Sequence, residues 1–379
     1  MNYPLAIFAP HIGACSETFI RRHMQNLLPE GTVVVTGTVD GPHAGYWSVD
    51  CPVLVLDRVQ ASGLKQRLVR AVARRFGWRP AEYLVSAVTR FLKRHHVQVV
   101  MGEYLDLFLP WLGVVQGLGV RLFGHAHGYD VSERLCDREW RAAYLGYNQA
   151  NGVITMSQVS RERLIGLGLE ASKVYVIPYG VDVPPLPLLR LQQKAVRCIA
   201  VGRMVAKKAP ILTLDAFRRA AKVCPNLQLD YVGAGELLLA AHQFVRTFKL
   251  GDSVRLHGPQ PNEVVRRLMR EADICLQHSV TDPATGDEEG LPVALLEAMA
   301  LSLPLVSTRH AGIPEAVLNG FTGYLVEEGD SHGMADRLIT LARDPGLRRR
   351  MGEAGWHRAK EHFSWEKERA DLLRVLGLV

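Results

Sequence analysis

Residues 287–300 read Asp-Glu-Glu-Gly-Leu-Pro-Val-Ala-Leu-Leu-Glu-Ala-Met-Ala. Good helix formers with apolar spacing follow Pro292, and proline is favoured at the first helical position, so we expect a helix that begins at Gly290 or Leu291. Such a start leaves backbone N–H groups unpaired at the positive end of the helix dipole. These groups form a favourable site for a phosphate or a sugar hydroxyl.

Two glutamates flank this site. Glu289 lies just before the helix and Glu297 in its second turn, about 12 Å further along the axis at ~1.5 Å per residue. A carboxylate can accept hydrogen bonds from adjacent hydroxyls of a ribose or hexose, while the amides bind phosphates. Gly290 lets a ligand approach closely. The predicted ligand is a sugar nucleotide, although the same residues taken alone also fit a buried crossover helix.

The spacing from Glu289 to Glu297, with Gly-Leu-Pro after the first glutamate and Ala-Met-Ala after the second, resembles the motif of a known family. This family is the retaining GT-B glycosyltransferases of family 4, in which the first glutamate meets the donor sugar and the second the nucleotide ribose. The resemblance implies a catalytic role for Glu289. It implies donor-binding roles for Gly290, Leu291, Pro292 and Glu297.

A second motif lies after an apolar run in the second half, where Gly202-Arg203 is followed by Lys208. Two cations five residues apart can bind a diphosphate at about 1.5–3 kcal/mol for each charge-assisted bond, although charge alone fits a solvated loop better. The loop resembles the family's Gly-Arg-x-x-x-x-Lys-Gly, in which the cations hold the leaving diphosphate and which implies a donor-binding role for Gly202. Ala209 and Ser302 stand where the family usually has glycine, and we expect both to be tolerated.

The third motif, residues 127–130, is similar to the family's His-Gly-x-Asp turn. By this resemblance His127 is a catalytic candidate that hydrogen-bonds the donor sugar, and Asp130 is a turn-stabilising or acceptor-side residue. Gly13 corresponds to a donor-phosphate loop, without the second glycine that the family often has. Gly258 corresponds to the loop that borders the nucleotide base.

A metal site is not expected. His125 and His127 could share one face of a strand, but no third ligand occurs at a suitable spacing. The chain contains no Asp-x-Asp motif of the metal-chelating transferases, and the six cysteines form no Cys-x-x-Cys pair. We therefore predict no metal and no cofactor, with the phosphate charge met by Arg203, Lys208 and helix amides.

Short apolar runs typical of buried parallel strands alternate with helical segments in both halves. Proline-rich residues 183–187 separate the halves. We expect an α/β protein of GT-B architecture, with two doubly wound Rossmann-like domains facing a cleft. The predicted parts are an acceptor-side domain 1–185, a nucleotide-sugar-binding domain 186–362 and a C-terminal helix 363–379 packing back toward the first domain. The runs are residues 5–8, 33–35, 53–56, 97–100, 121–125, 152–157, 174–182, 196–201, 227–232, 254–258, 272–276 and 303–308.

The chain has 379 residues and a formal net charge of +7, with 48% hydrophobic and 22% charged residues, as in a soluble globular protein. From Arg58 to Arg94 there are ten Lys or Arg against one acid, Glu82. This basic segment fits either docking onto anionic lipid or a solvated helix face, and no nucleic-acid recognition motif accompanies it. No apolar run approaches the roughly 18 residues of a membrane span. We expect a cytoplasmic protein, either free or peripheral on the inner face of the membrane.

The predicted function is the transfer of a sugar from a nucleoside-diphosphate sugar to an acceptor hydroxyl with retention of configuration. Residues 16–19, Ser-Glu-Thr-Phe, resemble the subgroup that builds bacterial surface polysaccharides of the colanic acid and amylovoran type. The acceptor is then a lipid-linked or oligosaccharide hydroxyl, as in polysaccharide or glycolipid biosynthesis. Two alternatives remain: a sugar-nucleotide epimerase of the same architecture, and a non-catalytic sugar-nucleotide-binding membrane scaffold.

Overall fold

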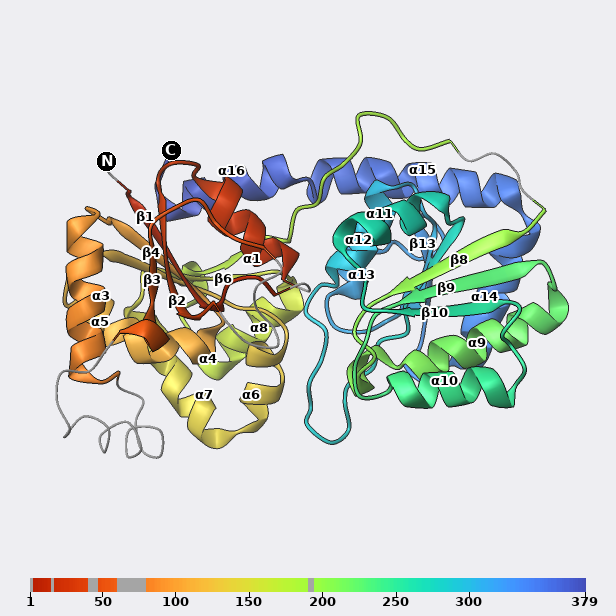
Figure 1. Cartoon of the computed structure of the whole chain (residues 1–379), viewed down its shortest axis with the longest axis horizontal. Helices are drawn as coiled ribbons and strands as arrows, with labels where there is room; N and C mark the ends of the chain where they lie inside the picture. Colours follow the sequence, from red (N-terminus) through yellow and green to blue (C-terminus); the bar gives the residue numbers. More distant parts are fainter. Residues whose placement is uncertain (1–2, 15–16, 40–46, 60–79, 190–193) are drawn as a thin grey trace. The chain divides into compact units, whose positions relative to one another are not determined.

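The computed structural model describes residues 3–14, 17–39, 47–59, 80–189 and 194–379. The chain forms two compact units (Figure 1). The first comprises Met1–Ile177 together with Arg369–Val379, and the second comprises Pro178–Glu368. The division falls after Ile177, before the proline-rich segment, whereas the sequence places it near residue 185. The last eleven residues group with the first unit.

The first unit contains a seven-stranded parallel sheet in the order β3-β2-β1-β4-β5-β6-β7. The first and fourth strands pair at its centre, with Leu5 opposite Val99, and the chain winds outward from them in both directions. This is the doubly wound order, which places ligand sites at the carboxyl ends of the two central strands. The strands are β1 Leu5–His11, β2 Thr32–Thr38, β3 Val53–Val55, β4 Val99–Glu103, β5 Arg121–His125, β6 Gly152–Thr155 and β7 Val174–Val176.

The second unit contains a six-stranded parallel sheet in the order β10-β9-β8-β11-β12-β13. Its central pair is β8 and β11, with Ile274 opposite Cys198, so the topology of the first sheet is repeated. Each run predicted from the sequence overlaps a strand of the structure, although the run 174–182 extends six residues beyond β7, and β13 was not predicted. The strands are β8 Val196–Val201, β9 Leu227–Val232, β10 Val254–Gly258, β11 Ile274–Leu276, β12 Leu305–Thr308 and β13 Gly323–Val326.

Helices cover both faces of each sheet, because strands buried on both sides need apolar partners above and below. Figure 1 shows this for the second unit, with α9 and α10 on one side of the sheet and α11 and α12 on the other. The α-helices of the first unit are α1 Thr18–Arg22, α3 Glu82–Arg94, α4 Leu105–Phe108, α5 Leu112–Gln116, α6 Glu133–Cys136, α7 Arg138–Tyr144 and α8 Gln158–Leu167. Those that follow are α9 Pro210–Val223, α10 Leu238–Thr247, α11 Asn262–Glu271, α12 Val293–Ala300, α13 Ile313–Ala316, α14 Ser331–Arg343, α15 Pro345–His362 and α16 Trp365–Leu376.

The predicted start of the helix in the glutamate motif is wrong by two to three residues. Pro292 keeps the φ that its ring imposes, −67°, but its ψ of 113° is extended. Pro292 is therefore the N-cap, and Val293 is the first helical residue. The later start leaves Glu289, Gly290 and Leu291 in a loop that leads into the helix.

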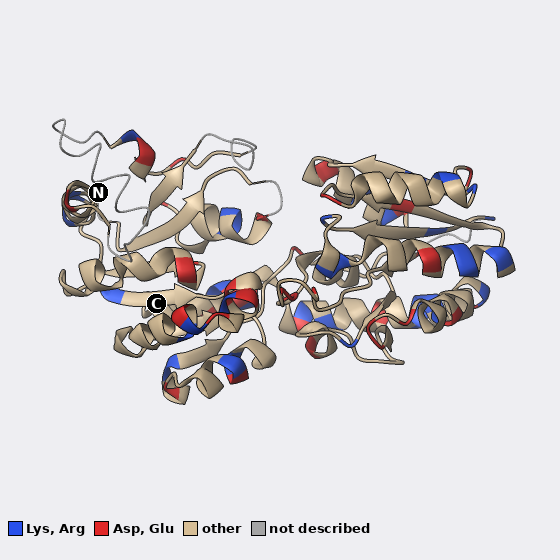
Figure 2. Ribbon diagram, turned by 90° about the horizontal axis from the view of Figure 1, so that it is seen from below, with Lys and Arg blue, Asp and Glu red and all other residues tan. Residues whose placement is uncertain are grey.

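Charged residues lie mainly on the helices, as Figure 2 shows by their blue and red colours against tan strands. In the described part of the chain, no helix has the length and apolar character that crossing a membrane requires. Much of the basic segment, for which the sequence leaves lipid docking and a solvated helix face as alternatives, lies outside the described residues, at positions 60–79. Ser16, the first residue of the Ser-Glu-Thr-Phe segment, lies outside them as well.

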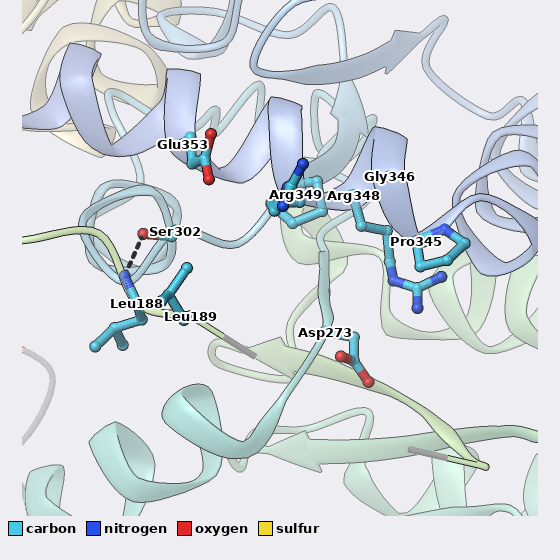
Figure 3. A pocket seen from close by; sticks show the side chains of 10 residues that line it. Leu188, Leu189, Asp273, Ser302, Pro345, Gly346, Arg348, Arg349 and Glu353 are labelled. Atoms are coloured by element: carbon cyan, nitrogen blue, oxygen red, sulfur yellow. Dashed lines mark hydrogen bonds between the residues drawn. The ribbon is translucent and has the colours of Figure 1, made fainter. Parts of the chain in front are cut away.

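The segment that follows the first unit runs along α15 within the second unit. The indole N–H of Trp356 donates to the carbonyl of Pro184 at 3.0 Å, and the backbone N–H of Leu188 donates to Oγ of Ser302 at 3.0 Å. A cavity of about 430 Å³ lies beside this segment (Figure 3). Its lining includes Leu189 and Arg348 but none of the predicted site residues, so it is not the candidate site.

Candidate functional site

The predicted diphosphate loop and the glutamate motif both follow central strands of the second sheet. Arg203 and Lys208 lie in the loop after β8, and Glu289 lies at the end of the segment that leaves the adjacent strand, β11. The carboxyl ends of adjacent central strands are where doubly wound sheets bind their ligands. The structure therefore brings two motifs that are about 80 residues apart to one place.

Lys208 and Glu289 form a buried ion pair, with Nζ 2.9 Å from Oε2 and side chains 12% and 9% exposed. Burial by itself would raise the pKa of the Glu289 carboxyl, but Lys208 and Lys207 hold that pKa below its usual range. Burial lowers the pKa of the Lys208 ammonium, an effect that Glu289 opposes. The two predicted residues are thus in direct contact, with the glutamate ionised.

The other carboxylate oxygen of Glu289 has no such partner. Oε1 is buried and accepts no hydrogen bond from any of the described residues. A buried acceptor left unpaired costs about 1–3 kcal/mol, so a donor supplied by a ligand would be favourable there. The backbone N–H groups of Gly290 and Leu291 likewise find no acceptor among the described residues. Unpaired donors and an unpaired acceptor therefore lie side by side in the sequence just before α12.

Lys207, which the sequence did not single out, fixes the geometry of this loop. Its ammonium lies 2.8 Å from the carboxylate of Asp287 and donates to the carbonyl of Glu288 at 3.0 Å. Its carbonyl accepts from the N–H of Val280 at 2.9 Å. Lys207 therefore joins the loop after β8 to both ends of the loop before α12. Nothing in the sequence indicates that the two adjacent lysines, Lys207 and Lys208, have different partners.

Arg203 is exposed, and its loop rests on the glycine turn that follows β9. Gly233 has φ +143° and Gly235 φ +157°, and a Cβ on Gly233 would lie only 1.8 Å from the carbonyl oxygen of Gly202. Met204 donates to the carbonyl of Ala234 at 2.8 Å. The Gly-x-Gly turn therefore supports the arginine loop through close backbone contact, in addition to connecting a strand to a helix.

The remaining predicted donor-binding residues of the second unit lie on the same edge of the sheet. Glu297 lies in the second turn of α12 and is partly exposed. Gly258 ends β10 at φ +65°, and its carbonyl accepts from the N–H of Gly233 at 2.9 Å. In the first unit, Gly13 follows β1 with φ +102°, a conformation that favours glycine.

His127 lies in the first unit in a buried cluster around one carboxylate. Oε2 of Glu103 lies 2.9 Å from Nε2 of His127 and 3.0 Å from Nδ1 of His125, and Oε1 lies 2.8 Å from Nδ1 of His23. Burial would raise the pKa of the Glu103 carboxyl, yet His125 and His23 hold it well below its usual range. Burial, with His125, lowers the pKa of His127 to about 4, so this ring is neutral at pH 7. Phe19 and Tyr104 pack on it, with ring centroids 4.8 and 4.4 Å away.

The sequence showed no third metal ligand near His125 and His127, but this cluster contains further groups that could bind a metal ion. Atoms of His23, Glu103 and His125 lie within 4.8 Å of one another, close enough to surround a cation. The His–Glu separations of 2.8–3.0 Å are also those of N–H···O hydrogen bonds, through which the three imidazoles can donate to one carboxylate. The residues come from α1 and its continuation, β4 and β5, so no local pattern could have predicted the group.

The sequence left two roles open for Asp130, and its contacts in the structure are those of a turn-stabilising residue. Its carboxylate accepts the backbone N–H of His127 at 2.7 Å and that of Leu105 at 2.9 Å, and the residue is fully buried. Both oxygens are thus used to hold the His127 turn against the start of α4. An acceptor-side role is not supported by this geometry.

Two sheets with this topology and these motifs define a GT-B glycosyltransferase. Residues 189–358 match the family described as "Glycosyl transferases group 1", and residues 32–184 match "Glycosyltransferase Family 4". Together the two matches cover most of the chain. The chain belongs to this family of glycosyltransferases.

Similar curated proteins act in polysaccharide synthesis according to their names. The amylovoran biosynthesis glycosyltransferase AmsK of Erwinia amylovora is 34% identical over 61% of this chain and 57% of its own length. The putative colanic acid biosynthesis glycosyltransferase WcaL of Escherichia coli is 31% identical over the same shares. The chain thus spans a little over half the length of these relatives.

Solved structures confirm the fold. Anabaena HepE, solved with UDP and glucose, has a TM-score of 0.80 at 17% identity, with both chains fully covered. A sucrose-phosphate synthase from Thermosynechococcus elongatus has a TM-score of 0.74 at 18% identity, covering 100% of this chain and 99% of the other. The predicted GT-B architecture is therefore confirmed.

Proposed function

We propose that the chain transfers a sugar from a nucleoside-diphosphate sugar to an acceptor hydroxyl, with retention of the anomeric configuration. The observation that carries this proposal is the buried pair of Lys208 and Glu289. One oxygen of this carboxylate and the N–H groups of Gly290 and Leu291 have no partner among the described residues. A cation suits the leaving diphosphate and an unpaired carboxylate oxygen suits a sugar hydroxyl. Family membership supports the reaction class.

Each residue then has a defined part in the reaction. Lys208 and Arg203 stabilise the charge that develops on the diphosphate, commonly the largest contribution to such catalysis. Glu289 orients the donor sugar, and Glu297 accepts hydrogen bonds from the ribose hydroxyls. For His127, held in one orientation by Glu103, we propose a hydrogen bond to the donor sugar. These residues supply the required charge, so we propose that neither a metal ion nor a cofactor is needed.

The biological setting is taken from the relatives. Their names support a place in bacterial polysaccharide or glycolipid biosynthesis, with a lipid-linked or oligosaccharide hydroxyl as acceptor. Work on such an acceptor would occur at the cytoplasmic face of the membrane, where the basic segment 58–94 would meet anionic lipid. The complex of HepE with UDP and glucose makes UDP-glucose the first donor to test.

A thermal-shift panel of UDP-, GDP-, ADP- and TDP-sugars tests the donor, with and without a chelator. A donor at about 100 times its Kd adds about 2.7 kcal/mol of stability, so one nucleotide class should raise the melting temperature by several degrees. Glu297→Ala should lose this shift, while Glu361→Ala, a change at an exposed residue of the same unit, should keep it. The absence of a shift with every nucleotide class would contradict the proposal, and a shift abolished by chelator would contradict its metal-free form.

Product analysis separates the two alternative functions. An epimerase would convert the bound donor without any acceptor, because both its substrate and its product are sugar nucleotides. A scaffold would bind the donor and form no product with a membrane extract. Transfer of labelled sugar to an acceptor in the extract is the result expected for a glycosyltransferase.

A further inference from the structure

The loop after β12 reaches the backbone of the donor-binding glutamate. Nε2 of His310 lies 3.0 Å from the backbone N of Glu289, and Nδ1 of His310 lies 2.6 Å from Oε1 of Glu328. His310 is 1% exposed and its contact with Glu289 is buried, whereas the Glu328 side chain is 36% exposed. One buried ring thus connects the loop before α12 to the segment that follows β13.

These two contacts fix the protonation of the ring. A backbone N–H can only donate, so Nε2 of His310 must carry the lone pair that accepts from Glu289. A carboxylate accepts, so Nδ1 must carry the proton that is donated to Glu328. The ring is therefore the neutral Nδ1–H form, and its partners determine which nitrogen carries the proton.

The segment that holds Glu328 is itself fixed by contacts to the loop after β11. Oε2 of Glu328 accepts the backbone N–H of Thr281 at 2.9 Å, and Nε2 of His278 accepts that of Gly329 at 2.9 Å. The carbonyl of Gly290 also accepts from the N–H of Gly312, two residues after His310, at 3.1 Å. The exits of β11, β12 and β13 are thus joined by hydrogen bonds that converge on the loop before α12.

We infer that His310 is a positioning residue of the donor site, acting through the backbone of Glu289 with its tautomer set by Glu328. The inference rests on the proposed function, because Glu289 is the residue that orients the sugar. His310 determines where the Glu289 backbone lies, and Lys208 determines where its carboxylate points. Loss of the imidazole acceptor leaves the Glu289 N–H buried without a partner and free to move away from the position that binds the donor.

Two substitutions at one position separate hydrogen bonding from packing. His310→Leu keeps an apolar side chain of similar size but removes the acceptor, and we expect the Kd for UDP-glucose, or for the donor identified in the panel, to rise about tenfold. His310→Gln can place its Oε1 where Nε2 lies, so donor affinity should return to within a few-fold of wild type. Isothermal titration gives both Kd values, and thermal unfolding without ligand shows whether each variant is folded.

Two neighbouring glutamates, Glu328 and Glu327, provide a test of the hydrogen bond between His310 and Glu328. Glu328→Ala removes the acceptor of the His310 proton and should weaken donor binding several-fold, because the ring can then turn. Glu327→Ala changes an adjacent carboxylate that is 76% exposed and should leave donor binding unchanged. A full loss of affinity in the glutamine variant, or wild-type affinity in the leucine variant, would overturn the inference. Failure of the wild type to bind any nucleotide sugar would instead contradict the proposed function.

Discussion

Two adjacent lysines show how burial and partners assign roles that residue type does not. Lys207 is 6% exposed and its ammonium is used by Asp287 and the carbonyl of Glu288, within the protein. Lys208 pairs with Glu289, and the other oxygen of that carboxylate has no hydrogen-bond partner in the described part of the chain. The first lysine therefore stabilises the loop, and the second is the one that we propose to bind the diphosphate.

We predict that Lys208→Ala lowers kcat by about 10²-fold or more, because a cation that stabilises the leaving group in the transition state is lost. Steady-state kinetics of sugar transfer measures the effect. Lys222→Ala, a change at an exposed lysine of the same unit, is the matched control and should retain full activity. Near-normal turnover in a folded Lys208→Ala protein would reject the role of this residue.

Two residues that stand where the family usually has glycine adopt left-handed backbone conformations. Ala209 has φ +38° and Ser302 has φ +58°. For residues with a Cβ, this region costs about 1–2 kcal/mol. Ser302 recovers part of that cost because its Oγ accepts from Leu188, whereas Ala209 has no side-chain bond to offer. We expected both replacements of the family's glycine to be tolerated. Only at Ser302 does the side chain form a hydrogen bond that offsets the backbone strain.

Glycine at these two positions should therefore act differently. Ala209→Gly relieves the strain and should stabilise the second unit by about 1 kcal/mol, raising its melting temperature by about 2–4 °C. Ser302→Gly relieves similar strain but loses the bond to Leu188, worth about 0.5–1.5 kcal/mol, so little net change is expected. Calorimetry on both variants checks this, and equal gains would show that the serine bond contributes nothing.

At the scale of elements, the exits of three neighbouring strands of the second sheet form one hydrogen-bonded group. His278 follows β11 and accepts from Gly329 after β13, while His310 follows β12 and accepts from Glu289. Both histidines are buried. Strand exits in a parallel sheet share one edge, so residues far apart in the sequence meet there. A neutral imidazole suits this place because it accepts a backbone N–H without bringing a charge.

Protonation of His278 at acidic pH should destabilise the hydrogen-bonded group at these strand exits. Burial lowers the pKa of His278 to about 4, against about 6.5 for an unfolded chain, so the unfolded state binds more protons between these values. The free energy of unfolding should then fall as the pH drops from about 6.5 to 4, by up to ~1.4 kcal/mol for each pH unit. Denaturant unfolding of the wild type at pH 7 and pH 5 measures this loss.

The matched variant is His278→Gln, which retains an acceptor for Gly329 but does not titrate. Its stability at pH 7 should be close to that of the wild type, and its loss at pH 5 should be smaller. Parallel acid curves for the two proteins would show that other groups cause the acid dependence.

At the scale of the whole molecule, the repeated topology explains why two similar units carry different chemistry. Each sheet has a central strand pair, β1 with β4 and β8 with β11, and each pair places loops at its carboxyl end. In the first unit these loops lead to the Glu103 histidine cluster, and in the second they lead to Lys208 and Glu289. The fold supplies two equivalent positions, and the residues at each one determine what it can bind.

The sequence by itself determined the described strands other than β13, the parallel α/β class and the positions of the three motifs. These features depend on neighbouring residues alone. An apolar run indicates a strand, and a motif such as Gly202-Arg203 is recognised within one short segment. Its errors were also local. The helix of the glutamate motif begins at Val293 because Pro292 adopts an extended ψ, and ψ depends on what the preceding loop contacts.

Only the tertiary structure determined which residues share a site. His23 lies 80 residues before Glu103, Lys207 lies 80 before Asp287, and His310 lies 21 after Glu289, yet each pair is in hydrogen-bond contact. Such contacts depend on the order and register of the strands. The packing of an entire unit determines that order and register. Burial within a folded unit also lowers the pKa of His127 and of Lys208, a shift that the same side chains would not undergo in water.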